Sequence, residues 1–298
     1  MSHITESSIK KITAPHIRAR KGGQPIIALT AYDYPTARLV DEAGFDFILV
    51  GDSLAQTVLG YDSTLPVTLD EMIAATRAVK RGVKRALIVG DMPFGYYQDD
   101  TKRGVESAIR FVKEGGAEAV KVEGGARRAG IVRAIVDAEI PVMGHIGLTP
   151  QSLLRMGGYK VQGKTLDAAR ELIDDALALE HAGAFAVVLE GIPAEISRII
   201  TERLSIPTIG IGAGVDCDGQ ILVFTDLVGL TFGHTAKFVR QYADVKSIMA
   251  DALKQYADDV KTRQFPAEAE SYHLPEGVAF NIIEEEHSES MPPLGPIN

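Results

Sequence analysis

Side chains able to do acid–base or metal chemistry stand within, or directly after, short apolar runs of this sequence. In chain order they are Asp33, Asp52, Ser53, Asp91, Lys121, Glu123, His145 and Glu190, followed by the glycine-rich segment Gly210–Gly214. Taken singly, each has an ordinary structural explanation, because an aspartate after a strand commonly forms a turn or caps a helix, and an isolated glycine-rich loop is a weak signal. Their repeated position at the ends of apolar runs indicates a shared site.

Lys121 and Glu123 are the hardest of these residues to explain by structure alone. They are two residues apart, so on a strand both side chains point to one face while Val120 and Val122 point to the other. If the valines pack against helices, the charged pair faces the inside of the fold. Because a buried charge pair without a function is costly, the pattern favours functional residues.

Four of the residues carry carboxylates, namely Asp52, Asp91, Glu123 and Glu190. If they converge on one cleft they cannot all stay ionised without a compensating cation, so either some are protonated or a divalent metal binds. Oxygen ligands of this kind suit Mg²⁺. A tetrahedral zinc site is not expected, because Cys217 and His145 each stand alone.

A metal, a lysine, a histidine and a free carboxylate suit enolate chemistry. The metal would hold the two oxygens of a 2-oxo acid while the carboxylate removes the neighbouring proton. Lys121 could instead form a Schiff base with the carbonyl, which would make a metal unnecessary. Gly210–Gly214 could cradle a phosphate. A purely non-catalytic assembly protein is disfavoured, since apolar residues would serve inward positions better.

Eight short apolar runs predict strands. They are Ile26–Tyr32, Phe45–Val50, Ala86–Val89, Ala119–Val122, Pro141–Met143, Phe185–Leu189, Thr208–Ile211 and Leu227–Leu230. Most are continuously apolar rather than alternating, which is typical of strands buried on both faces.

Helical patterns lie between the runs. Thr68 and Glu71 form a capping box before one helix, and apolar residues at helical spacing predict another over 166–181. Pro193 suits the first turn of a third helix. Apolar residues spaced from Phe238 to Val260 predict a long closing helical segment, as one helix or two.

Strands and helices alternating in this way predict an α/β fold, the (β/α)8 TIM barrel, whose active sites lie at the carboxyl ends of the strands. The rival, an open doubly wound sheet, normally has a glycine-rich turn straight after its first strand, whereas this chain has Thr30–Pro35 there. We expect residues 1–263 to form a single barrel domain with an N-terminal helical lead-in. Residues 264–298 are expected to form an acidic, proline-containing extension.

Charge and composition exclude several classes of function. The 298 residues are 46% hydrophobic with a net charge of -9, and seven glutamates but no Lys or Arg follow Arg263. A near-neutral body with an acidic tail argues against nucleic acid or an anionic membrane as partner. A single cysteine excludes an intrachain disulfide. The polar N-terminus lacks the pattern of a secretory signal, and no apolar run reaches the ~18 residues of a membrane helix. We therefore expect a cytoplasmic protein.

Eight ordered segments resemble the ketopantoate hydroxymethyltransferase (3-methyl-2-oxobutanoate hydroxymethyltransferase) family. They are Thr30–Asp33, Val50–Ser53, Gly90–Pro93, Val120–Gly124, Gly144–Ser152, Gly157–Gly163, Leu189–Glu190 and Gly210–Gly214. The likeness runs in order from about residue 7 to about residue 273. It implies a TIM barrel of the phosphoenolpyruvate/pyruvate superfamily type.

The resemblance also implies a reaction. A hydroxymethyl group passes from 5,10-methylenetetrahydrofolate to 3-methyl-2-oxobutanoate through a Mg²⁺-stabilised enolate, giving 2-dehydropantoate (ketopantoate) in pantothenate and coenzyme A biosynthesis. The phosphate interpretation of Gly210–Gly214 loses weight, because neither reacting centre is a phosphate. Family members usually assemble as decamers, a pentamer of dimers.

The site residues that the resemblance implies match the polar residues named above. One Mg²⁺ per subunit is expected on Asp52, Asp91 and Glu123, and the oxo acid is expected to contact Asp52, Ser53, Asp91 and Lys121. Glu190 would accept the C3 proton, while Lys121 and His145 would be the further catalytic residues, His145 hydrogen-bonding near the reacting oxygens.

The loop Gly157–Gly163 is a candidate lid. Its three glycines, with Lys160 and Lys164, suggest a mobile segment that meets the anionic glutamate tail of the folate.

Overall fold

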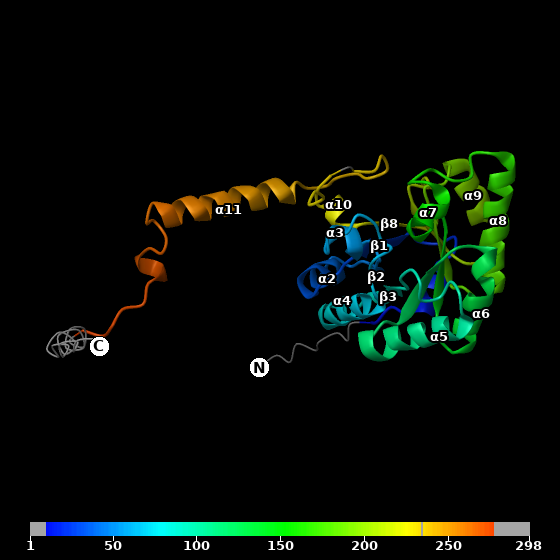
Figure 1. Cartoon of the computed structure of the whole chain (residues 1–298), viewed down its shortest axis with the longest axis horizontal. Coiled ribbons are helices and arrows are strands. Elements are labelled where there is room, and N and C mark those ends of the chain that lie inside the picture. The colour runs from blue at the N-terminus through cyan, green and yellow to red at the C-terminus, as the bar shows by residue number, and fades with distance from the viewer. Residues whose placement is uncertain (1–9, 234, 277–298) are drawn as a thin grey trace, which may run out of the picture. The chain divides into compact units, whose positions relative to one another are not determined.

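The computed structural model describes residues 10–233 and 235–276. Eight parallel strands close into a barrel in which each strand pairs with its neighbours in sequence and β8 pairs with β1. The strands are β1 Ile26–Thr30, β2 Phe47–Val50, β3 Leu87–Asp91, β4 Ala119–Glu123, β5 Val142–Gly147, β6 Ala186–Glu190, β7 Thr208–Ile211 and β8 Gly219–Leu222. Figure 1 shows the strands with helices outside them. The predicted TIM barrel is confirmed.

Helices precede, separate and follow the strands. The α-helices are α1 Ala14–Arg18, α2 Tyr34–Glu42, α3 Leu54–Thr57, α4 Leu69–Gly82, α5 Thr101–Arg110, α6 Ala129–Asp137, α7 Leu153–Met156, α8 Leu166–His181, α9 Ala194–Arg203, α10 Phe224–Leu227 and α11 Val245–Lys261. A π-helical turn, η1 Phe111–Gly115, extends α5, and the short 3-10 helices are η2 Ala126–Arg128, η3 Pro150–Ser152 and η4 Glu268–Glu270.

The local signals for two helices are confirmed. At the start of α4 the Glu71 N–H donates to Thr68 Oγ1 (3.3 Å) and the Thr68 N–H donates to a Glu71 carboxylate oxygen (2.7 Å), which completes the capping box. Helix α8 covers the predicted range 166–181. Pro193 lies one residue before its predicted position, because it is the N-cap of α9 rather than part of the first turn.

The predicted eighth strand, Leu227–Leu230, is wrong. Leu227 is the last residue of α10, and the strand that closes the barrel is Gly219–Leu222. Only residues 212–218 separate β7 from β8, and they contain no helix, so the strand–helix alternation breaks at this point. Strand β8 begins with Gly219, because a Cβ at this position would lie 2.5 Å from the Ile26 carbonyl oxygen of β1.

The chain after the barrel forms a separate compact unit. Internal contacts divide the chain into Met1–Asp244 and Val245–Asn298. In the second unit α11 begins at Val245, so residues 238–244 are not part of the expected helical segment. Within this unit Tyr256 and Phe265 make an edge-to-face ring contact at 5.4 Å. The boundary expected at residue 263 stays a prediction, and residues 277–298 of the acidic extension lie outside the described residues.

The barrel has two apolar cores, one on each face of the sheet. The inner one holds residues that alternate along the strands, such as Leu87 and Val89 on β3, and α1 adds the fully buried Ile17. The outer one holds the other face of each strand together with helical residues such as Met72 and Ile73 of α4. Strands buried on both sides explain why their sequences read as continuous apolar runs.

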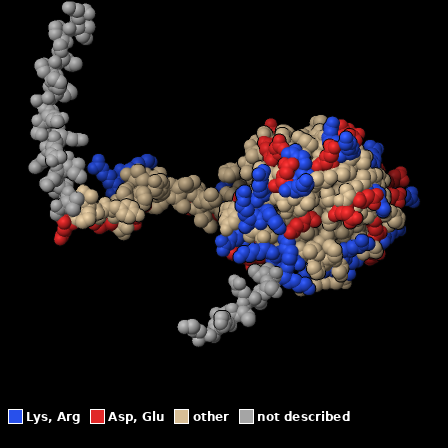
Figure 2. Space-filling model, turned by 90° about the horizontal axis from the view of Figure 1, so that it is seen from below, with Lys and Arg blue, Asp and Glu red and all other residues tan. Residues whose placement is uncertain are grey.

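The surface of the barrel is mixed in charge. On the face shown in Figure 2, Lys and Arg stand beside Asp and Glu, and the basic side chains gather toward one side. Among the described residues, none of the helices combines the length and the apolar character needed to cross a membrane.

Candidate active site

Strand β4 turns Lys121 and Glu123 into the barrel. Val120 and Val122 are fully buried in the outer core, while Ala119 belongs to the inner core. Lys121 and Glu123 lie on the inner face with Ala119, and they are only 3% and 4% exposed. The predicted orientation of this pair is confirmed.

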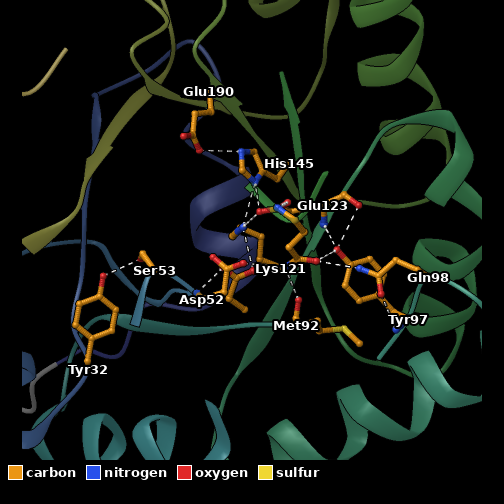
Figure 3. A network of polar contacts seen from close by, with 12 residues as sticks. Tyr32, Asp52, Ser53, Met92, Tyr97, Gln98, Lys121, Glu123, His145 and Glu190 are labelled. Atoms are coloured by element: carbon orange, nitrogen blue, oxygen red, sulfur yellow. Dashed lines mark hydrogen bonds and ion pairs between the residues drawn. The ribbon is translucent and has the colours of Figure 1, made fainter. Parts of the chain in front are cut away.

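Lys121 lies at the centre of a charged cluster. Its Nζ is 2.9 Å from Asp91 Oδ1, 3.5 Å from Glu123 Oε1 and 3.1 Å from His145 Nδ1. Glu123 lies on the same strand, whereas Asp91 and His145 come from the strands on either side, where Asp91 pairs with Lys121 and His145 pairs with Glu123 in the sheet register. Figure 3 shows Lys121, Glu123 and His145 close together.

His145 links this cluster to Glu190 at the end of β6. Its Nδ1 lies 3.2 Å from Glu123 Oε1, and its Nε2 lies 3.1 Å from Glu190 Oε2 (Figure 3). Burial and the Lys121 ammonium act to lower the pKa of His145, but Glu123 and Glu190 outweigh them and raise it to about 9. The two carboxylates beside the ring therefore favour its protonated form.

Asp52 completes the cluster from the loop after β2. Its N–H donates to Asp91 Oδ2 (2.9 Å), and its own Oδ2 accepts from Gln151 Nε2 (3.0 Å). Burial raises the pKa of both Asp52 and Asp91, and for each the charge of Glu123 adds to the effect. The excess of negative charge expected from the sequence is thus present here.

The other two charges of the cluster are stabilised in their ionised forms. Burial acts to raise the pKa of Glu123, but Lys121 and His145 outweigh it and lower that pKa. Burial likewise acts to lower the pKa of Lys121, but Asp91, Glu123 and Asp52 raise it above its ordinary value. Lys121 is consequently a firmly protonated ammonium group.

All seven predicted site residues line one cavity of about 180 Å³. Its polar side is formed by Asp52, Ser53, Asp91, Lys121, Glu123, His145 and Glu190. Its apolar side includes Leu49, Val188, Ile211, Ile221 and Phe238. A cavity with one charged and one apolar side suits a small acid that carries a hydrocarbon group.

Ser53 and the candidate lid lie at the edge of this cavity. The Ser53 hydroxyl is 2.8 Å from the Tyr32 hydroxyl (Figure 3). Of the loop 157–164, Tyr159 lines the cavity, whereas Lys160 and Lys164 are exposed and do not. The contact of these lysines with a folate stays a prediction.

Two of the polar features singled out in the sequence have structural explanations. Asp33 is the N-cap of α2, where its Oδ1 accepts from the Thr36 N–H (2.8 Å). In Gly210–Gly214 the glycines allow close packing, because a Cβ on Gly212 would lie 2.6 Å from the Phe238 ring and one on Gly214 would lie 2.5 Å from Ala194 Cβ.

The donor set fits a hard divalent cation. Two buried carboxylate oxygens, Asp91 Oδ1 and Glu123 Oε1, lack a hydrogen-bond partner, since their contacts with Lys121 and His145 are ion pairs without hydrogen-bond geometry. Oxygen donors of this type are the ligands that Mg²⁺ prefers. As they stand, no three His, Cys, Asp or Glu side chains among the described residues are arranged to hold a metal ion. The Lys121 ammonium is the cation placed between these carboxylates.

Three buried polar residues around the site are absent from the sequence-based set. Gln151 and Tyr97, 5% and 2% exposed, hydrogen-bond each other and the carboxylate-bearing residues. Thr64 lines the cavity with a buried hydroxyl that lacks a partner. Their type gives no signal in the sequence, because an uncharged polar residue in a loop is ordinarily solvated.

Fold and site together define an enzyme of the TIM-barrel class, with its polar residues at the carboxyl ends of the strands. Solved structures with this fold include a phosphonopyruvate hydrolase (TM-score 0.58, 14% identity, covering 93% of this chain and 95% of that one). A 2,3-dimethylmalate lyase, a member of the PEP mutase/isocitrate lyase superfamily, matches with TM-score 0.57 and 18% identity over 92% of this chain and 94% of that one. These likenesses show that the chain shares the barrel fold of both enzymes.

The sequence matches the ketopantoate hydroxymethyltransferase family over residues 11–268. A 3-methyl-2-oxobutanoate hydroxymethyltransferase of Koribacter versatilis is 57% identical over 276 residues, 92% of this chain and 94% of the relative. One from Thermoanaerobacter sp. (strain X514) is 55% identical over 255 residues, 86% and 93% of the two chains. The chain belongs to the ketopantoate hydroxymethyltransferase family, as the sequence motifs indicated.

Proposed function

We propose that this enzyme transfers a hydroxymethyl group from 5,10-methylenetetrahydrofolate to 3-methyl-2-oxobutanoate, giving 2-dehydropantoate for pantothenate and coenzyme A biosynthesis. The observation that carries the proposal is the single small cavity that joins an ammonium, three buried carboxylates and a separate Glu190. Membership in the family, and the names of relatives more than half identical in sequence, support the choice of substrates.

The charged side of the cavity binds the oxo acid. The ammonium of Lys121 faces the cavity and attracts the carboxylate and the oxo group of the substrate. Its raised pKa supports this electrostatic function over the alternative of a Schiff-base aldolase, because a nucleophilic lysine must lose its proton. Asp52, Asp91 and the Ser53 hydroxyl complete the contacts with the substrate.

Asp52, Asp91 and Glu123 would hold one Mg²⁺ per subunit. When bound, the ion supplies positive charge that stabilises negative charge developing on the substrate oxygen. Two carboxylate oxygens that form ion pairs but no hydrogen bonds, Asp91 Oδ1 and Glu123 Oε1, support this assignment.

Glu190 is the base that takes the proton from C3 of the substrate. Its side chain is 16% exposed, whereas the side chain of Glu123 is only 2% exposed, so Glu190 lies at the open edge of the cluster. His145 holds the Glu190 carboxylate in place from 3.1 Å. The apolar residues Val188 and Ile211 next to Glu190 receive the hydrocarbon part of the substrate.

Removal of the C3 proton leaves an enolate whose C3 carbon can attack the methylene carbon of the folate. A carbon–carbon bond forms, the two bonds from that carbon to the folate nitrogens break, and one water supplies the hydroxyl group. The C3 proton and the remaining proton of the water end on the two released nitrogens. The products are 2-dehydropantoate and tetrahydrofolate. We also propose that the enzyme works in the cytoplasm as a homodecamer, a pentamer of dimers.

Turnover of the two substrates with and without EDTA, together with borohydride treatment, tests the proposal. We expect product formation that EDTA abolishes and Mg²⁺ restores, with no adduct on Lys121. Activity that survives EDTA, with borohydride trapping the oxo acid on Lys121, would favour the Schiff-base alternative. Absence of turnover in every condition would contradict the proposed function.

A further inference from the structure

Gln151 is a buried amide between the carboxylates of the site. It lies in η3, which is separated from the end of β5 by two residues, and is 5% exposed. Its side chain and its backbone N–H together make five hydrogen bonds, two of them to the cavity-lining carboxylates of Asp52 and Glu123. A buried amide with its donors and acceptor all satisfied is a rigid group.

Two chains of hydrogen bonds determine which way the Gln151 amide faces. The Gly95 N–H can only donate, and it does so to Gln98 Oε1 (2.8 Å), so Gln98 Nε2 donates to Gln151 Oε1 (2.9 Å). The Glu123 N–H likewise donates to the Tyr97 hydroxyl (3.1 Å). That hydroxyl donates in turn to Gln151 Oε1 at 2.6 Å, a shorter contact than its 3.4 Å approach to the Glu123 carbonyl.

With its oxygen occupied by two donors, Gln151 must present Nε2 to the other side. There Nε2 donates to Asp52 Oδ2 (3.0 Å) and to the Met92 carbonyl (2.9 Å). The Met92 carbonyl can only accept, which excludes the flipped amide. The Gln151 backbone N–H also donates to Glu123 Oε2 (3.0 Å). One oxygen of each carboxylate is therefore bound to Gln151, and the carboxylates cannot rotate freely.

We propose that Gln151 is a positioning residue that holds Asp52, and through its backbone Glu123, in the orientation that binds the divalent cation. The identity of the cation rests on the proposed function, whereas the hydrogen bonds do not. Partners of this kind, one step removed from a metal, typically contribute 10- to 100-fold to metal affinity. Tyr97 and Gln98 act on the carboxylates indirectly, because their hydrogen bonds to Gln151 Oε1 fix the orientation of the Gln151 amide.

Equilibrium binding of Mn²⁺ to the purified full-length chain without substrates tests the proposal. Gln151→Met keeps the length of the side chain but removes the hydrogen bond from Nε2 to Asp52 Oδ2, so we expect the Kd for Mn²⁺ to rise at least tenfold. Gln255→Met is the matched control, since Gln255 is an exposed glutamine whose amide donates to Asp259 of its own helix α11, and its Kd should stay within about twofold of wild type. A Kd for Gln151→Met within twofold of wild type would overturn the proposal.

A positioning function differs from a merely structural one in its dependence on metal concentration. For Gln151→Met we expect kcat to recover toward wild type at saturating Mg²⁺. At a low concentration of Mg²⁺ the metal should not change the melting temperature of this variant. A kcat that stays low at every Mg²⁺ concentration, with unaltered Mn²⁺ affinity, would contradict a metal-positioning function.

Tyr97→Phe covers the case in which Gln151→Met does not fold. It deletes only the hydroxyl that donates to Gln151 Oε1, and we expect a smaller rise of the Mn²⁺ Kd, about two- to fivefold. An unchanged Kd in a folded Tyr97→Phe protein would overturn the proposal.

The two proposals fail in different ways. Wild-type turnover with the oxo acid and the folate decides the function, and the ratio of variant to wild-type Mn²⁺ Kd decides the position of Gln151. If wild type binds no Mn²⁺ at all, the assignment of Gln151 fails together with the metal site, whatever the turnover.

Discussion

The two ends of the barrel interior hold opposite kinds of side chain on the same strands. Strand β3 runs from Leu87 and Val89 to Asp91, and β4 runs from Ala119 to Lys121 and Glu123. At the amino end the interior holds an apolar cluster that Ile17 of α1 joins, while the carboxyl end carries the charged cluster. The apolar packing at the amino end stabilises the barrel and offsets the free-energy cost of burying charges at the carboxyl end.

The largest effect is expected for the central charge of the carboxyl end. Lys121→Met leaves Asp91 and Glu123 buried without their cation, so we expect the free energy of unfolding to fall by about 3–5 kcal/mol. Urea denaturation of the variant and of wild type measures this difference. A loss below about 1 kcal/mol would show that the carboxylates do not depend on Lys121.

The loss in Lys121→Met should also depend on pH. The pKa values of Asp52 and Asp91 are raised by burial in the folded protein. Ionising these two carboxyl groups therefore lowers the free energy of unfolding. The loss is absent below the ordinary carboxyl pKa and grows as the pH rises through the raised pKa values. Without Lys121 these pKa values rise further, so the destabilisation should be larger at pH 8 than at pH 6. Equal losses at the two pH values would contradict the assignment of the charges.

Glu190 should affect catalysis far more than stability, because its side chain lies at the open edge of the cluster. For Glu190→Gln we expect kcat for hydroxymethyl transfer to fall by about 10³-fold, within the usual range for a general base. The melting temperature should stay close to that of wild type. A fall in kcat of less than tenfold would exclude Glu190 as the base.

The amino end should show the reverse behaviour. Ile17 is fully buried in the inner core, so we expect Ile17→Val to lower the free energy of unfolding by about 1 kcal/mol while kcat at 25 °C stays unchanged. Denaturant titration and a turnover assay on the same preparation measure both. A fall in kcat without a loss of stability would mean that the two ends are not independent.

Substitution of Asp33 tests whether this acidic residue has a structural or a catalytic function. Because its carboxylate caps α2 through the Thr36 N–H, Asp33→Ala should lower stability by about 0.5–1 kcal/mol. Turnover should be unaffected, in contrast to Glu190→Gln. A loss of turnover in a folded Asp33→Ala protein would place Asp33 in the site after all.

The sequence was most informative where side-chain type and strand position reinforce each other. Alternation on β4 predicted that Lys121 and Glu123 point inward, and this is confirmed because Val120 and Val122 are buried in the outer core. The capping box of α4 and the range of α8 were also predictable, since both depend on local hydrogen bonds and periodicity.

The remaining features depend on contacts that are distant in sequence. Strand β8 was misplaced because no helix precedes it and because its glycine is required by the close approach of Ile26. Gln151 was missed because its position becomes apparent only when Asp52, 99 residues away, is brought beside it. Asp33 could not be distinguished from the site aspartates, since all of them stand at or just after the end of an apolar run.

The central claim is that Glu190 removes the C3 proton of the oxo acid in this cavity, and proton exchange measures that step directly. Wild type with Mg²⁺ and 3-methyl-2-oxobutanoate in D₂O, without folate, should replace the C3 hydrogen by deuterium, as followed by ¹H NMR. Glu190→Gln should show no exchange above the rate without protein. Hydroxymethyl transfer by the wild type, with C3 exchange no faster than in buffer or equally fast in Glu190→Gln, would contradict the claim.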